Sequence, residues 1–224
     1  AYPSIVGGGA NACVLHYTDN SSTLQAGELV LIDAGCEYRH YAADITRTFP
    51  VDGVFSQAQR ALYDIVLAAN EAAIAECRPG APFNAPHDAA IKVMVEGLLT
   101  LGLLQGAPAE IIASGAYLQF CPHKSCHWLG LDVHDVGDYR LGNDWRPLQP
   151  GMVLTVEPGL YIAADTSIYG NTQHSKAAQS MFEESKGTGI RIEDDVLITD
   201  TGCEVLSHGV PKTAEAIENL MRAS

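Results

Sequence analysis

Basic residues are scarce in this sequence. Lys and Arg together number 13, against 27 Asp and Glu, which gives a formal net charge of −14 at pH 7. Proteins that bind nucleic-acid backbones or anionic membranes need clustered cations on their surface. The composition therefore argues against a nucleic-acid partner and against an anionic membrane as a partner.

Long apolar runs and paired cysteines are also missing. No run approaches the roughly 20 apolar residues that cross a bilayer, and no signal-peptide pattern opens the chain. The 6 cysteines show no paired spacing, which indicates reduced thiols and a cytoplasmic location. With 224 residues, 47% of them hydrophobic, the chain can bury a substantial core and is most simply one domain over residues 1–224.

Two aspartates lie inside apolar, strand-like runs, where a lone carboxylate is costly to bury. Asp33 ends the first run and Asp44 lies within the second. If the runs form a hairpin that turns near Tyr38 and Arg39, the two carboxylates face each other with Cβ atoms roughly 5 Å apart. Like charges at that separation require a proton or a cation between them. The alternative is a strand-end Asp and a surface Asp that meet only in the assumed register.

Two glutamates occupy comparable settings. Glu157 closes an apolar run just before a Pro-Gly pair that ends the strand. Glu193 alternates with Arg191 in another strand-like run, so these two side chains share a face. Taken singly, Glu157 can be a strand end that reaches solvent, and Arg191 with Glu193 an ordinary ion pair. Four carboxylates in such settings together favour a metal centre.

The segment 121–135 is rich in histidine and offers nitrogen ligands. His127 and His134 are an odd number of residues apart, so one straight strand points them to opposite faces, and we expect different roles for them. A rival interpretation is a zinc knuckle formed by Cys121, His123, Cys126 and His127. A second cysteine pair with zinc-finger spacing is missing, which argues against it. Core histidines with a buried thiol are the simpler alternative.

The candidate residues lie in segments that resemble a known family. The segments are 5–9, 16–17, 31–38, 44–50, 127–137, 155–161 and 189–195. Together they resemble the catalytic domain of bacterial Xaa-Pro aminopeptidase (aminopeptidase P), a member of the creatinase/aminopeptidase/prolidase superfamily. The resemblance runs from about Tyr2 to Met221. It implies an α+β pita-bread fold, in which helices cover a curved, mostly antiparallel sheet.

Five residues match the metal ligands of that family. They are Asp33, Asp44, His127, Glu157 and Glu193. Asp44 and Glu193 stand at the positions that bridge two ions, and Glu157 is also the implied proton shuttle. Four carboxylates carry about −4 and two divalent cations about +4, which favours two ions over one. An oxygen-rich set with one imidazole favours Mn²⁺, with Zn²⁺ or Co²⁺ as possible substitutes.

Further candidates match residues around the substrate. The histidines implied in peptide binding and oxyanion stabilisation are His134 and His16. Arg191 and Tyr161 match residues that support the ligands or line the pocket, and His123 matches a pocket histidine. The family usually has Gly and Ser where this chain has Lys124 and Cys126, which leaves the shape of this loop and the role of His123 open.

Helix signals divide the rest of the chain. Ser56 can N-cap a helix that runs towards Cys77, a second helix is expected after residues 84–86, and a last one starts at Thr213. The polar stretch 165–187 predicts an enlarged surface loop. Because the chain has no initiator Met, we expect it to lack the upstream domain and the first helices of the family's catalytic domain.

The implied enzyme is a proline-specific, dinuclear metallo-aminopeptidase. It is expected to hydrolyse the bond between an N-terminal residue and a following proline, with a hydroxide that bridges two divalent ions as the nucleophile. Prolidase, which acts on Xaa-Pro dipeptides, is one alternative. A non-catalytic pita-bread module that binds peptides or proteins is another, disfavoured because all five ligand positions carry ligating residues. The expected partners are peptides with proline at the second position and, for the full-length enzyme, further copies of itself in a homo-oligomer.

Overall fold

The computed structural model describes residues 1–166 and 174–223. The strands are β1 (Ile5–Gly8), β2 (Leu29–Asp33), β3 (Glu37–Tyr38), β4 (Tyr41–Ala42), β5 (Thr46–Pro50), β6 (Arg140–Leu141), β7 (Asp144–Trp145), β8 (Val153–Val156), β9 (Gly159–Ile162), β10 (Thr188–Arg191), β11 (Asp194–Ile198) and β12 (Cys203–Val205). The α-helices are α1 (Gln57–Glu76), α2 (Ala85–Thr100), α3 (Pro108–Ser114), α4 (Lys176–Ser185) and α5 (Ala214–Arg222), with 3-10 turns at Gly9–Cys13 and Ala116–Gln119. Within the described residues, no helix is both long and apolar enough to span a membrane.

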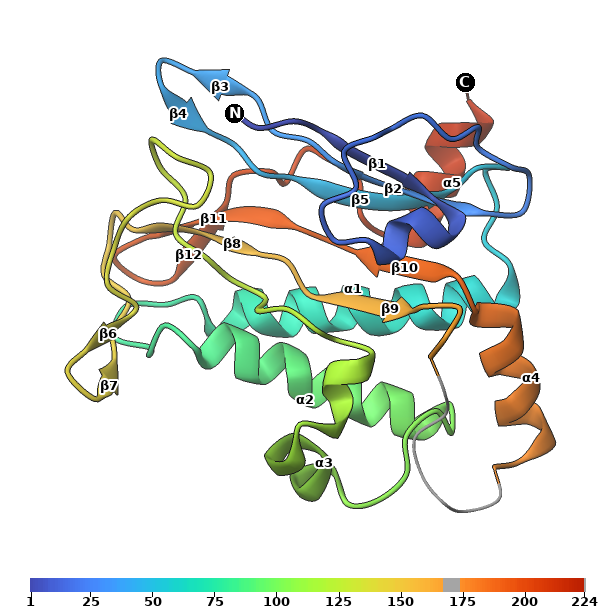
Figure 1. Ribbon diagram of the computed structural model, residues 1–224. Coiled ribbons are helices and arrows are strands. Elements are labelled where there is room, and N and C mark those ends of the chain that lie inside the picture. Colours follow the sequence, from blue (N-terminus) through green and yellow to red (C-terminus); the bar gives the residue numbers. More distant parts are fainter. Residues whose placement is uncertain (167–173, 224) are drawn as a thin grey trace.

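The strands form small antiparallel sheets that lie side by side. The sheet β1-β2-β5 lies next to the pair β9-β10, and the sheet β12-β11-β8 continues beyond that pair (Figure 1). Side chains tie the first sheet to the second: Thr48 Oγ1 donates to the Arg191 carbonyl at 3.0 Å and accepts from the Arg191 N–H at 3.1 Å. The Glu193 N–H donates to the Thr46 carbonyl at 3.1 Å. These links give a continuous, mostly antiparallel surface.

Helices α1 and α2 pack against each other beneath this surface, with α1 against β8, β9 and β10 (Figure 1). The capping box expected at Ser56 is present: Ser56 Oγ accepts from the Gln59 N–H at 3.2 Å, and Gln59 Oε1 accepts from the Ser56 N–H at 2.9 Å. Apolar residues at helical spacing, Leu62, Val66 and Ala69, are buried on one face of α1. The expected helices are therefore confirmed.

The hairpin between β2 and β5 turns one residue later than expected. Tyr38 pairs with Tyr41, so Arg39 and His40 form the turn, and both have positive φ, at 51° and 72°. The pattern is that of a two-residue type I′ turn, which usually contains Gly or Asn. Asp33 therefore lies opposite Thr46, and its predicted pairing with Asp44 is wrong by two residues. A shift of two keeps each side chain on the same face, so both aspartates still point to one side.

The expected long surface loop over residues 165–187 is partly a helix. Helix α4 begins after Ser175, whose Oγ accepts from the Ala178 N–H at 3.1 Å. Ala178 and Phe182 lie one helical turn apart and are both buried. The prediction of a loop is therefore wrong for residues 176–185, because it overlooked this cap and the apolar pair that follows it. The part at 167–173 lies outside the described residues.

Candidate metal and substrate site

The candidate ligands come from the ends of strands and line one cleft of about 780 Å³. Asp33 ends β2, Asp44 precedes β5, Glu157 follows β8 and Glu193 lies between β10 and β11. His127 lies on a segment that runs along β8: its carbonyl accepts from the Thr155 N–H at 2.9 Å. Because these residues lie at or next to strand ends, their side chains need not follow the face of the sheet. The hydrogen bonds of the neighbouring strands hold their backbone in place. The fold thus gathers all five candidates from distant parts of the chain.

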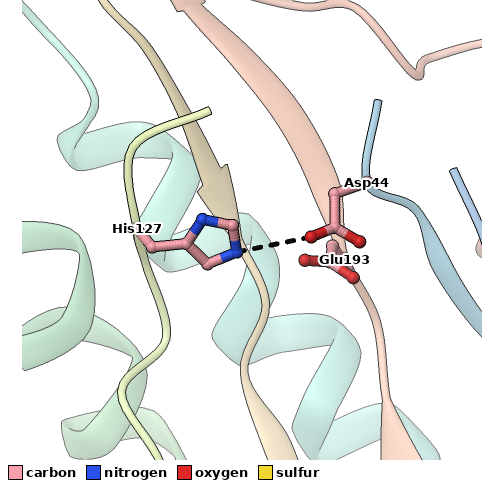
Figure 2. A group of neighbouring side chains, drawn as sticks. All are labelled: Asp44, His127 and Glu193. Atoms are coloured by element: carbon pink, nitrogen blue, oxygen red, sulfur yellow. Dashed lines mark ion pairs between the residues drawn. The ribbon is translucent and has the colours of Figure 1, made fainter. Parts of the chain in front are cut away.

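Three of the five form a compact group. Asp44, His127 and Glu193 each offer a ligand atom within 4.8 Å of the others, and Figure 2 shows the imidazole pointing at the two carboxylates. His127 Nε2 lies 3.4 Å from Asp44 Oδ2 and 3.5 Å from Glu157 Oε1. Its Nδ1 donates to the Trp128 carbonyl at 2.9 Å, which leaves Nε2 as the nitrogen directed at the site. Asp33 and Glu157 are not members of this compact group.

Asp33 and Asp44 meet at the hydroxyl of Tyr2. The Tyr2 hydroxyl is within hydrogen-bonding distance of Oδ1 of both carboxylates. Burial, together with these two acidic partners, raises the pKa of Tyr2. Tyr2 was not among the residues predicted from sequence. Its contact depends on the antiparallel pairing of β1 with β2, in which Ile5 lies opposite Asp33, so that the residues before Ile5 extend past Asp33 towards Asp44.

Arg191 is the cation of the site. Its Nη2 donates to Asp33 Oδ2 at 2.6 Å, its Nη1 to the Tyr161 hydroxyl at 2.9 Å and its Nε to Thr46 Oγ1 at 3.2 Å. Thr46 in turn donates to Glu193 Oε2 at 2.6 Å. The expectation that Arg191 and Glu193 share a face is confirmed, with Thr46 between them as a residue the sequence argument did not identify.

His123 continues this chain of hydrogen bonds. Its Nδ1 lies 2.8 Å from the Lys124 carbonyl and so carries the proton, which makes Nε2 the acceptor of the Tyr161 hydroxyl at 2.9 Å. Burial lowers the pKa of His123 to about 4, so the ring is neutral at pH 7. Tyr161 itself is buried. The loop that carries Lys124 thus still places His123 in the cleft wall.

His16 and His134 are exposed side chains that line the same cleft. The ring of His134 meets that of His127 edge-to-face, with centroids 4.3 Å apart. The expectation of opposite faces assumed one straight strand, and it is wrong because the chain turns between residues 129 and 138. Burial and the neighbouring His127 lower the pKa of His134. Both histidines are within the cleft but neither belongs to the compact group of ligand atoms.

The carboxylates carry more negative charge than the protein compensates. Burial raises the pKa of Glu157 to about 7, despite the opposing effect of His127 and Arg191. Burial and three neighbouring carboxylates raise the pKa of Glu193 well above its ordinary value. Asp44 differs: burial opposes its charge, but hydrogen bonds from His127 and Tyr2 outweigh burial and lower its pKa. Such a group stores a repulsion that bound cations relieve.

Arg191 changes the charge balance that the sequence suggested. Counting its ion pair with Asp33, the ligand group carries about −3, so one divalent ion leaves about −1 and two leave about +1. Net charge therefore does not favour two ions over one, contrary to the sequence argument. The donor set does fit divalent cations, because it offers buried carboxylate oxygens and one oriented imidazole nitrogen.

A buried asparagine supports two of the candidate ligands from below. Asn70, on the sheet-facing side of α1, donates from Nδ2 to the carbonyls of Val156 at 3.1 Å and Ile192 at 3.4 Å. These residues come directly before Glu157 and Glu193. In the sequence, Asn70 is visible as a polar residue among the apolar positions of one helix face, and the structure shows that it is fully buried.

Ion pairs hold the neighbouring backbone. Lys212 Nζ donates to Asn70 Oδ1 at 2.7 Å and to Asp194 Oδ2 at 2.8 Å, and Arg47 Nη2 donates to Asp194 Oδ1 at 2.7 Å. Asp195 accepts the Asp44 N–H at 3.2 and 3.3 Å. These contacts fix the chain on both sides of Glu193 and at Asp44.

The zinc-knuckle alternative does not agree with the structure. Cys121 and Cys126 are buried, and Cys121 Sγ contacts Met94 Sδ at 3.6 Å. Burial raises the pKa of the Cys121 thiol to about 12. Among residues 1–166 and 174–223, the group with ligand spacing is the one of carboxylates and His127. All six cysteines are free thiols, as expected.

The raised pKa values predict how stability depends on pH and metal. The folded carboxyls of Glu157 and Glu193 have raised pKa values and bind protons that unfolded carboxyls have lost. For Glu157 this stabilising contribution is complete below about pH 4.3 and is lost as pH rises through about 7. Metal competes with these protons. At about 100 times its dissociation constant, Mn²⁺ should add about 2.7 kcal/mol, or roughly 5–10 °C in Tm, at pH 8. The gain at pH 5.5 should be clearly smaller.

Scanning calorimetry with and without Mn²⁺ at both pH values measures this difference. Glu157→Gln is the matched variant, since it removes one titrating group with a pKa of about 7 and keeps the side-chain size. It should reduce the pH dependence of the metal-free protein. Equal Tm gains at pH 5.5 and pH 8 would contradict the idea that metal replaces protons at these carboxylates.

Comparisons with known proteins agree with this arrangement. A model of metallopeptidase family M24 matches residues 1–200. The Xaa-Pro aminopeptidase of Escherichia coli strain K12 is 52% identical to this chain over 225 residues, which covers 100% of the chain and 48% of that protein. The Xaa-Pro aminopeptidase of Haemophilus influenzae is 50% identical over 222 residues, with 99% of the chain and 48% of that protein covered. The chain thus spans about half the length of the curated relatives it matches.

Solved structures show the same likeness. The Pseudomonas aeruginosa aminopeptidase PepP gives a TM-score of 0.92 at 51% identity and covers 99% of this chain and 48% of that one. A zinc-substituted Escherichia coli aminopeptidase P in complex with product gives a TM-score of 0.90 at 51% identity, with 99% and 47% covered. The resemblance drawn from the sequence and the expected α+β pita-bread fold are confirmed.

Proposed function

The chain belongs to metallopeptidase family M24, and from that premise we propose that it carries the active site of an Xaa-Pro aminopeptidase. The observation that supports this most is the cleft in which four carboxylates and His127 converge. The substrates would be peptides with proline at the second position. The relatives named above are Xaa-Pro aminopeptidases, and the chain covers about half of each.

The proposed metal ligands are Asp33, Asp44, His127, Glu157 and Glu193. Their positions support two adjacent ions, because Asp44 lies between Asp33 on one side and the imidazole of His127 on the other. Asp44 and Glu193 are the proposed bridging ligands. We propose Mn²⁺ as the preferred ion, since oxygen donors outnumber nitrogen four to one in this set. Bound divalent ions would polarise the scissile carbonyl and supply an activated water as nucleophile.

The protein side chains have separate proposed roles. Glu157 lies against the ligand group, with Oε1 3.5 Å from His127 Nε2, so its carboxylate can take a proton from the nucleophile and pass it to the leaving nitrogen. His134 and His16 project into the cleft, where an N–H can donate to the developing oxyanion or to the peptide. Arg191, Tyr161 and His123 form a hydrogen-bonded chain that holds the Asp33 side of the site and one wall of the cleft.

The size of the cleft supports action on peptides longer than dipeptides. Its lining continues from the carboxylates to the aromatic side chains of Phe83, Tyr139 and Trp145. A residue beyond the proline extends about 3.3–3.6 Å further, and this wall can accommodate it. Prolidase action on dipeptides is the alternative. A cytoplasmic location and a homo-oligomer of the full-length enzyme also remain predictions.

Product analysis with matched peptides tests the proposal. The purified chain with Mn²⁺ should release free Ala from Ala-Pro-Ala-Ala-Ala faster than from the dipeptide Ala-Pro, and should leave Ala-Ala-Ala-Ala-Ala uncut. Chelation should stop the reaction, and restored Mn²⁺ should recover it. A faster reaction on Ala-Pro would favour prolidase instead. A chain that binds no metal by elemental analysis and cuts none of the peptides would favour the non-catalytic binding module.

A further inference from the structure

A second polar group lines the cleft apart from the metal ligands. It consists of His87, in the first turn of α2, and Lys124, in the loop before His127. Their side chains approach each other, with Lys124 Nζ 3.4 Å from His87 Nε2. The steps proposed above for hydrolysis do not use either residue.

The hydrogen bonds of His87 determine where its proton lies. The Ser125 N–H donates to His87 Nδ1 at 3.3 Å, and Ser125 Oγ lies 3.1 Å from the same nitrogen. A nitrogen that accepts a backbone N–H carries no proton itself. Burial and the charge of Lys124 lower the pKa of His87 to about 4, so the ring is neutral and its single proton is on Nε2.

His87 Nε2–H and the Lys124 ammonium are therefore two donors that face each other. Neither can accept from the other, so the pair leaves hydrogen bonds to be satisfied by an acceptor in the cleft. Among the ion pairs of the described residues, none includes Lys124. The charge of Lys124 also acts on the nearby carboxyl of Asp88, where it lowers the pKa against the larger effect of burial, and Asp88 Oδ2 accepts from Asn84 Nδ2 at 2.5 Å.

The surroundings also favour an anion. His87 lies in the first turn of the 16-residue helix α2, where the helix dipole is positive. A carboxylate can accept one hydrogen bond at each oxygen, so it suits two donors that lie close together, and a charged donor strengthens the contact. An amide oxygen offers no charge to balance the ammonium. Lys124 is exposed, so a ligand can reach it without a conformational change of the core.

We propose that Lys124 and His87 bind a carboxylate of the substrate, so that the enzyme prefers Xaa-Pro peptides that carry a negative charge at this part of the cleft. The proposal rests on the proposed function, which it deepens by naming a substrate class. The carboxylate can come from the C-terminus of a short peptide or from an Asp or Glu side chain. Both sources offer the same chemistry, and a peptide series separates them.

The series compares four tripeptides of similar size. Ala-Pro-Ala amide carries no carboxylate. Ala-Pro-Ala with a free C-terminus, Ala-Pro-Glu amide and Glu-Pro-Ala amide each place one carboxylate at a different position. The measured quantities are kcat/KM with Mn²⁺ and, for each peptide, the dissociation constant by calorimetry. We expect at least one carboxylate peptide to exceed the neutral amide by roughly tenfold, the size expected of one charge-assisted hydrogen bond in a partly exposed site.

Variants assign the preference to this pair. Lys124→Met should bring the ratio of carboxylate to amide peptide to about one, and Lys124→Glu should invert it. His87→Asn keeps an acceptor for the Ser125 N–H and removes the Nε2 donor, so it should reduce the ratio partly. Lys92→Met is the matched control, because Lys92 is an exposed lysine on the same helix that does not line the cleft, and it should leave the ratio unchanged.

The outcomes distinguish this proposal from the proposed function. Cleavage of all four peptides at similar rates would overturn the carboxylate site and leave the aminopeptidase intact. A carboxylate preference that persists in Lys124→Met would overturn it as well. If no peptide is cleaved, the proposed function fails, and the calorimetric ratio between acid and amide peptides still decides whether Lys124 and His87 bind a carboxylate.

Discussion

Replacing Asp44 with Ala is expected to abolish peptide hydrolysis and to remove more bound metal than replacing His127 with Ala. Asp44 lies between the two halves of the ligand group: its Oδ1 shares the Tyr2 hydroxyl with Asp33, and its Oδ2 is 3.4 Å from His127 Nε2. A bridging carboxylate serves both ions, whereas the imidazole serves one. Asp44→Ala should therefore retain close to no metal, and His127→Ala about one ion per chain.

Elemental analysis after gel filtration in a fixed Mn²⁺ concentration gives the metal content of each variant. Asp19→Ala is the control, because Asp19 is an exposed aspartate outside the cleft. Circular dichroism checks that each variant is folded, because replacing Asp44 also lowers the repulsion between buried carboxylates and so changes the stability of the protein. Equal metal loss in Asp44→Ala and His127→Ala would show that Asp44 does not bridge.

The two aspartates could be found from sequence because strand alternation is robust to small errors. The expected register placed Asp33 opposite Asp44, while the structure places it opposite Thr46. The register error is two residues, and an even shift keeps each side chain on the same face of the sheet, so the predicted face was correct. The turn itself was harder to predict, because Arg39 and His40 adopt the positive φ values that Gly or Asn usually adopt.

Residues that position the ligands were mostly not predictable. Thr46 contacts Glu193 across 147 residues of sequence, and Asn70 contacts the Val156 carbonyl across 86. Local patterns of hydropathy give the face of a strand or helix but not which faces meet. The polar character of Asn70 on an apolar helix face was visible, but its partners depend on how α1 packs under β8 and β10.

The charge of the site shows the same limit of prediction from sequence. From sequence, Arg191 and Glu193 share a face, which suggests an ion pair between them. The structure instead pairs Arg191 with Asp33 at 2.6 Å and inserts Thr46 between Arg191 and Glu193. The guanidinium of Arg191 therefore lies next to the candidate metal ligands, and its positive charge changes the formal charge of the site. The positions of the donors around Asp44 support two ions better than the sum of charges does.

Replacing His134 with Ala is expected to leave metal content unchanged and to lower kcat by roughly 10²-fold or more. The ring lies edge-to-face with His127, at 4.3 Å between centroids, but it is outside the compact group of ligand atoms. Its lowered pKa, caused by burial and by His127, keeps it neutral near pH 7 with one N–H to donate. A donor placed at the oxyanion acts mainly in the transition state, so KM should change little.

Two further variants separate this role from a structural one. His134→Gln keeps an amide N–H near the same place and should recover part of kcat, whereas a general loss of packing would not respond to it. His208→Ala removes an exposed histidine that does not line the cleft, and it should leave kcat unchanged. If His134→Ala loses metal together with activity, His134 is a ligand or holds one in place. Unchanged kcat with raised KM would instead assign it to ground-state binding of the peptide.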